Sequence, residues 1–98
     1  MIINKSVTNE TLTLFVEGRL DTTTAPELEA ALSASLSGIN ALVIDLAKLE
    51  YISSAGLRVI LKAQKLMNML GTMKLINVNE SIMEVFEITG FVDILTIE

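Results

Sequence analysis

The segment from Ala41 to Leu46 is a short aliphatic run, interrupted only by Asp45 near its end. Such a run is too short for an ordinary helix, and its continuity is typical of a central β-strand that is covered on both faces. Segments with helical spacing lie on either side of it, at 25–36 and 54–70. A buried strand between two helices favours an α/β fold.

The helices have recognisable start and stop signals. Thr24-Ala25-Pro26-Glu27 and Ser81-Ile82-Met83-Glu84 have the form of capping boxes, in which a hydroxyl and an acidic side chain bind the first free N–H groups of a helix. We therefore expect a helix from Ala25 to Leu36, with Gly38 as a left-handed cap, and a later one that Gly90 ends. Between them, a helix should run from Ser54 or Ala55 to Leu70, with Gly71 as its stop.

The remaining apolar runs predict strands. Ile2–Val7 and Leu12–Val16 form an expected hairpin, followed by a loop at Gly18–Asp21. Further strands are expected at Met73–Val78 and Ile94–Ile97, and Lys48–Glu50 is predicted to form a turn. The order β-β-α-β-α-β-α-β implies a mixed β-sheet with helices packed on it. At this length the chain is expected to form a single domain, residues 1–98.

Composition excludes several classes of function. The formal net charge of −5 opposes binding to nucleic acid or to an anionic membrane. The chain has no histidine and no cysteine, so it lacks the usual general base, a thiolate nucleophile and the common zinc ligands. Phosphate-loop, dinucleotide and nucleophile-elbow motifs are also missing. We therefore expect a protein that is not an enzyme and that has no cofactor and no metal.

No apolar run approaches the ~18 residues of a membrane span, and the first residues do not resemble a signal peptide. The absence of cysteine fits a reducing compartment. The expected location is the cytoplasm, without membrane insertion.

The stretch from Tyr51 to Leu61 delivers two hydroxyls, Ser53 and Ser54, to the start of a helix. Free N–H groups and the helix dipole favour an anion there. Arg58 follows Ser54 by one turn, and Lys62 and Lys65 continue the same stripe, so a phosphoryl group on a serine would find cations nearby. Alternatively, the serine only caps the helix and the cations form a solvated face.

A second polar segment should lie beside this stretch. Ligands of α/β sheets usually bind at the carboxyl ends of strands, so the loop from Arg19 to Thr24 and the Ser53-Ser54 turn are expected at one end of the domain. Asp21 could provide a polar contact there or act only as a turn residue. Gly56 could serve only to allow close packing of the helix on a strand.

Four motifs, in this order, resemble those of STAS domains of the bacterial anti-sigma-factor-antagonist type. They are Gly18-Arg19-Leu20-Asp21, Leu42-Val43-Ile44-Asp45-Leu46, Tyr51-Ile52-Ser53-Ser54-Ala55-Gly56-Leu57 and Ile88-Thr89-Gly90-Phe91. The resemblance implies a partner, an anti-sigma factor with serine-kinase activity, and a serine phosphatase that reverses the phosphorylation.

The resemblance also implies which residues act. The phosphorylated serine of the family stands at the start of the second long helix, which is Ser54 here, and phosphorylation prevents binding of the kinase. The expected partner-binding residues are those of the two polar segments: Asp21, Thr22, Thr23, Ser53, Ser54, Ala55, Gly56 and Arg58.

One position departs from the family pattern. The best-known switches have Asp directly before the phosphorylated serine, whereas this chain has Ser53. Ser53 is therefore an alternative acceptor. Two other functions stay open: a STAS module that is never phosphorylated and assembles into a stress-signalling or lipid-transport complex, and a module that binds a nucleotide or another small ligand.

Overall fold

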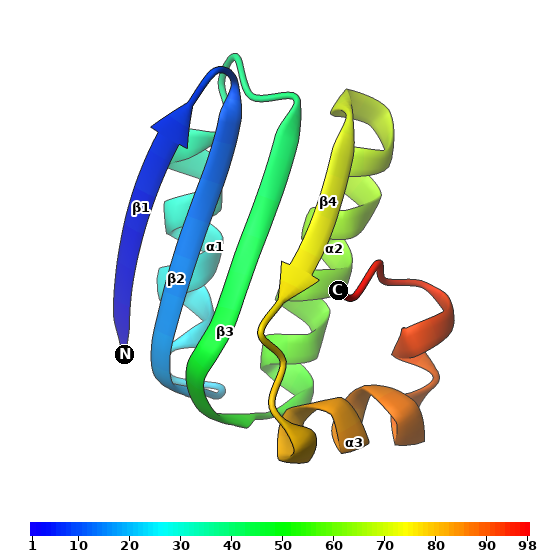
Figure 1. Cartoon of the computed structure of the whole chain (residues 1–98). Coiled ribbons are helices and arrows are strands. Elements are labelled where there is room, and N and C mark those ends of the chain that lie inside the picture. Colours follow the sequence, from blue (N-terminus) through cyan, green and yellow to red (C-terminus); the bar gives the residue numbers. More distant parts are fainter.

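The computed structural model describes residues 1–98 and contains one four-stranded sheet (Figure 1). The strands are β1 (Ile2–Thr8), β2 (Thr11–Leu20), β3 (Ala41–Ile52) and β4 (Thr72–Ile76). The helices are α1 (Ala25–Ser35), α2 (Ser54–Leu70), α3 (Glu80–Thr89) and a short 3-10 helix, η1 (Phe91–Asp93).

The sheet has the order β1-β2-β3-β4 and is mixed, as predicted. β1 and β2 form an antiparallel hairpin, and β2, β3 and β4 are parallel. The hairpin turn consists of Asn9 and Glu10, both with positive φ, which suits the right-handed twist of the two strands. The predicted fold class, a single α/β domain with a mixed sheet and helices packed on it, is confirmed.

The hydrophobic core lies between the sheet and the helices, because α1 and α2 cover the same face of the sheet (Figure 1). Alternate strand residues, such as Leu12, Leu14 and Ile44, are buried on this face. The opposite face carries no helix, and Phe15 on β2 remains 43% exposed there. The prediction that the strand at 41–46 is covered on both faces is therefore wrong: the residues pointing to its open face are only half-buried.

β3 is longer than predicted, because its pairing with β2 continues past two shifts in register. Phe15 pairs with Asp45 but Glu17 pairs with Lys48, and Gly18 pairs with Leu49 but Arg19 pairs with Tyr51. Each step leaves one extra residue in β3, as in a β-bulge. The predicted turn at 48–50 is therefore strand, and the predicted loop at 18–21 is strand as far as residue 20.

Two of the predicted helix caps are wrong. Thr24 precedes α1 but makes no side-chain capping bond, because its hydroxyl donates to the carbonyl of Arg19 over 2.7 Å. At α3 the cap is Asn79, whose side-chain oxygen accepts from the N–H of Ile82, rather than Ser81. α1 ends with Leu36 as its cap, and Gly38 comes two residues later with a φ of 76°. Gly71 and Gly90 end their helices as predicted.

The predicted strand Ile94–Ile97 is reduced to one parallel bridge between Leu75 and Ile97. The N–H of Leu75 donates to Thr96, and the carbonyl of Leu75 accepts from Glu98. The chain therefore covers part of the outer edge of β4 without forming a strand. None of the helices combines the length and hydropathy needed to cross a membrane.

Candidate functional site

The candidate site lies where β2 and β3 end side by side. The backbone N–H of Ser53 donates to the carbonyl of Leu20 over 2.9 Å, joining the two strand ends. The loop at 21–24 and the start of α2 are therefore neighbours. This confirms the prediction that the two polar segments share one end of the domain.

Ser53 is the N-cap of α2. Its backbone is extended, with φ −99° and ψ 176°, and its Oγ accepts a hydrogen bond from the N–H of Gly56 over 3.4 Å. Its carbonyl accepts from Leu57 and begins the helix. The hydroxyl of Ser53 is half-buried and already has a structural task.

Ser54 is the first residue of α2 and has different surroundings. Its side chain is exposed, and its hydroxyl forms no hydrogen bond within the chain. It lies within the first turn, where unpaired N–H groups and the dipole of a 17-residue helix favour negative charge. Arg58, one turn further along, is exposed as well. Of the two serines, Ser54 has the more accessible hydroxyl.

Gly56 allows α2 to begin close to the sheet. A Cβ atom at this position would lie 2.7 Å from Cγ of Leu20 and 3.0 Å from Cγ1 of Ile52. Contacts this short force the neighbouring atoms to move. Gly56 is buried, so its observed task is close packing, and its predicted contact with a partner stays a prediction.

Asp21 organises the loop at 21–24. Its Oδ1 accepts from the N–H groups of Thr23 and Thr24, at 3.0 and 3.1 Å. Its carbonyl accepts from the N–H of Ala25, the first residue of α1. The bond from the backbone of Thr24, with help from Thr23 and the charge of Arg19, lowers the pKa of the Asp21 carboxyl. Asp21 is thus a turn residue here, and its role in partner binding stays a prediction.

Arg19 links the two segments from the end of β2. Its guanidinium lies 4.2 Å from the centre of the Tyr51 ring, and its Nε lies 3.6 Å from Oδ2 of Asp21. The first contact is a cation–π interaction across neighbouring strands. The sequence does not predict this pair, because Arg19 faces Tyr51 only through the irregular register of β3.

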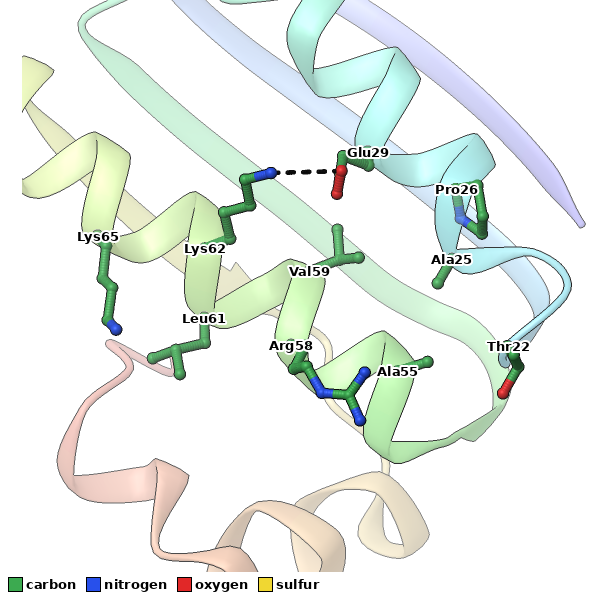
Figure 2. A pocket seen from close by; sticks show the side chains of 10 residues that line it. All are labelled: Thr22, Ala25, Pro26, Glu29, Ala55, Arg58, Val59, Leu61, Lys62 and Lys65. Carbon is green, nitrogen blue, oxygen red and sulfur yellow. Dashed lines mark hydrogen bonds and ion pairs between the residues drawn. The ribbon is translucent and has the colours of Figure 1, made fainter.

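A groove runs between the start of α1 and the exposed face of α2 (Figure 2), with a volume of about 510 Å³. It is lined by ten residues: Thr22, Ala25, Pro26, Glu29, Ala55, Arg58, Val59, Leu61, Lys62 and Lys65. Lys62 reaches across it to Glu29, at 3.4 Å.

Among the predicted partner-binding residues, the structure brings Thr22, Ala55 and Arg58 together around the groove. The other predicted residues do not line the groove: Asp21, Thr23, Ser53, Ser54 and Gly56. The part of the groove that α1 forms was not predicted, because the sequence of one helix does not indicate which other helix packs beside it. No group of three or more acidic side chains in this structure could hold a metal ion.

Comparisons with known proteins identify the family of the chain. The STAS domain family matches residues 3–98. A Bordetella bronchiseptica protein named "Putative anti-sigma factor antagonist BtrV" is 40% identical over 84 residues, which make up 84% of this chain and 72% of the relative. The chain therefore belongs to the STAS domain family, in its group of anti-sigma-factor antagonists.

Solved structures show the same fold at lower identity. An anti-sigma factor antagonist from Mycobacterium paratuberculosis superposes with a TM-score of 0.89 at 23% identity, covering 98% of this chain and 83% of that one. The unphosphorylated anti-sigma factor antagonist SpoIIAA gives 0.83 at 19% identity, covering 99% and 88%. The phosphorylated form of SpoIIAA, a Bacillus cell fate determinant, gives 0.77 at 19% identity, covering 99% and 91%.

Proposed function

We propose that this chain binds an anti-sigma factor with serine-kinase activity and is released when that kinase phosphorylates Ser54. The observation that carries the proposal is the exposed, unbonded hydroxyl of Ser54 at the start of α2, next to Ser53, whose hydroxyl caps the helix. The partner-binding surface comprises the loop at 21–24 and the first turn of α2. The chain acts as ligand and substrate rather than as an enzyme, in the cytoplasm, where kinase and ATP are available.

The named relatives support this proposal. The Bordetella protein carries the name of an anti-sigma factor antagonist. SpoIIAA shares the fold and has been solved in both unphosphorylated and phosphorylated forms. A STAS fold of this kind is thus compatible with a phosphate group in at least one protein.

The mechanism follows from charge. A phosphate adds about −1.5 to −2 charges at pH 7. In the free protein this charge is favourable at the start of α2, with Arg58 one turn away. When a partner covers the site, water is excluded and a charge without a matching partner costs several kcal/mol. Phosphorylation therefore prevents binding without a change of fold, and a serine phosphatase restores it.

The test combines phosphorylation and binding. The wild-type chain, Ser54→Ala and Ser53→Ala are incubated with the cognate anti-sigma factor and ATP, and phosphate is located by mass spectrometry. We expect phosphate on wild type and Ser53→Ala, and none on Ser54→Ala. Calorimetry should show that Ser54→Ala binds the anti-sigma factor and that Ser54→Asp does not. Wild-type affinity of Ser54→Asp would refute the switch.

Ser53 favours a second candidate function. Because it stands where the resemblance expects Asp, the kinase could fail to recognise the site, and the chain would then bind its partner constitutively. In that case no phosphate is found on either serine, and Ser54→Asp co-purifies with the same scaffold or transport subunit as wild type.

A further inference from the structure

Positive charge is concentrated on α2. The helix carries Arg58, Lys62 and Lys65 and no acidic residue, although the chain as a whole has seven basic and twelve acidic residues and a net charge of −5. All three cations line the groove and have exposed side chains. The groove thus carries positive charge on a protein whose net charge is negative.

Two of these cations have no partner within the chain. The ion pairs of the structure use Arg19, Lys62 and Lys74, so Arg58 and Lys65 are free. In Figure 2, Lys62 points across the groove toward Glu29, whereas Arg58 and Lys65 project from the outer side of α2. Two unpaired cations, separated by about two turns of helix, leave room for two negative groups.

Leu61 lies between Arg58 and Lys65 on α2 (Figure 2), and the side of the groove toward α1 has an apolar lining of Ala25, Pro26, Ala55 and Val59. Small side chains of this kind admit a close approach of another chain. The site therefore combines a shallow apolar floor with cations at its rim, the usual arrangement of a protein interface.

We propose that the groove receives an acidic segment of the anti-sigma factor, with carboxylates on Arg58 and Lys65 and a small apolar side chain between them. This inference rests on the function proposed above and specifies its partner contact. A nucleic acid fits less well, because affinity for a phosphate backbone requires several neutralised phosphates and the rest of the chain is acidic.

The same arrangement explains how phosphorylation could act through the groove. Ser54 and Arg58 stand four residues apart on α2, which places them on one face of the helix. A phosphate on Ser54 would pair with Arg58 and so compete with the carboxylate of the partner. Phosphorylation then removes a cation from the binding site as well as adding negative charge.

The test reverses one free cation at a time. Lys65→Glu should lower the association rate with the anti-sigma factor about tenfold at low salt, since rim charges act mainly on association, and high salt should reduce the difference. Lys48→Glu is the matched control: Lys48 is exposed and unpaired but lies on β3, outside the groove. It should leave the rate nearly unchanged. Equal effects of the two variants would overturn the proposal.

A model ligand tests the site without the partner. An alternating Glu-Ala peptide should bind the wild-type chain and Lys48→Glu, but not Lys65→Glu, and the Gln-Ala peptide should bind none of them. A Glu-Ala peptide that fails to bind, or a short DNA duplex that binds as tightly as the peptide, would overturn the proposal.

The two proposals fail in different ways. If Ser54→Asp abolishes binding of the anti-sigma factor while Lys65→Glu leaves the association rate unchanged, the groove is not the acidic site and the phospho-switch stands. If Ser54→Asp binds normally while Lys65→Glu still slows association, the switch is wrong and the acidic contact stands.

Discussion

At the scale of single residues, Ser53 and Ser54 have the same side chain in different surroundings. Ser53 Oγ accepts from the N–H of Gly56, whereas the hydroxyl of Ser54 has no partner in the chain. Removal of the Ser53 hydroxyl should therefore lower the stability of α2, whereas removal of the Ser54 hydroxyl should change only its surface. Separate measurements of stability and phosphorylation can distinguish the two.

Ser53→Ala should lower the free energy of unfolding by about 1 kcal/mol, because it removes the N-cap. Ser53→Asp should keep the wild-type stability, since aspartate also caps helices well. Urea denaturation of the three proteins measures the difference. Ser54→Ala is the control and should leave stability unchanged. An equal loss in both alanine variants would contradict the assignment of Ser53 as the cap.

The lowered pKa of Asp21 predicts that the free energy of unfolding depends on pH in the acidic range. Its pKa in the folded protein is lowered from the ordinary value of 3.8, first by the hydrogen bond from the backbone of Thr24. A lowered folded pKa means that the charged form stabilises the fold. This contribution is fully present above the unfolded pKa and is lost as the pH falls through the folded pKa.

In Asp21→Asn the loop keeps an acceptor oxygen but loses the charge. We therefore expect the stability difference between wild type and Asp21→Asn to be largest near neutral pH and to shrink below about pH 4. Urea denaturation over this pH range measures it. A difference that stays constant with pH would mean that the carboxylate charge does not stabilise the loop. Glu50→Gln is the control variant, because Glu50 is exposed on β3 and forms no ion pair.

At the scale of elements, the sequence allowed the position of most strands and helices to be predicted, because periodicity reports which side of an element is buried. The prediction failed where the position of a residue depends on the register between β2 and β3. Leu46, Leu49 and Ile52 are buried three residues apart, as the two extra residues in β3 require, and this spacing does not resemble a strand. The prediction of helix caps also failed at Thr24, since its hydroxyl donates to the carbonyl of Arg19 instead of capping α1.

The junction between α2 and the sheet depends on Gly56. Gly56→Ala should lower the free energy of unfolding by about 1–3 kcal/mol, because its Cβ would press against Leu20 at 2.7 Å. In a Leu20→Ala background the same change should cost clearly less, since the closest contacting atoms are gone and only the contact with Ile52 at 3.0 Å remains. Urea denaturation of the two single variants and the double variant gives this coupling. Additive effects would show that the clash is relieved by other movements.

At the scale of the whole molecule, the fold class and the position of Ser54 at the start of a helix could be predicted from sequence, but the groove could not. Its cations lie at regular helical spacing on α2, and this stripe is visible in the sequence. Its other wall is α1, which approaches α2 only because both cover one face of the sheet (Figure 1). The ion pair between Lys62 and Glu29 spans 33 positions of the chain, so no local pattern indicates it.

Because Ser54 lies outside the core, a charge there should change the surface and leave the fold intact. Ser54→Asp should raise the free energy of unfolding by about 0.3–1 kcal/mol at low ionic strength, through the positive end of α2. Ser54→Lys should lower it by a similar amount. Urea denaturation measures both changes, and high salt should reduce them.

Amide chemical shifts show where the effect of Ser54→Asp ends. We expect changes in the first turns of α2 and in the neighbouring loop at 21–24, because these segments meet at the joined ends of β2 and β3. The amides of buried strand residues such as Leu14 and Ile44 should keep their positions. Shifts that spread through these strands would mean that the charge alters the packing of the sheet, and a switch confined to the binding surface would then be wrong.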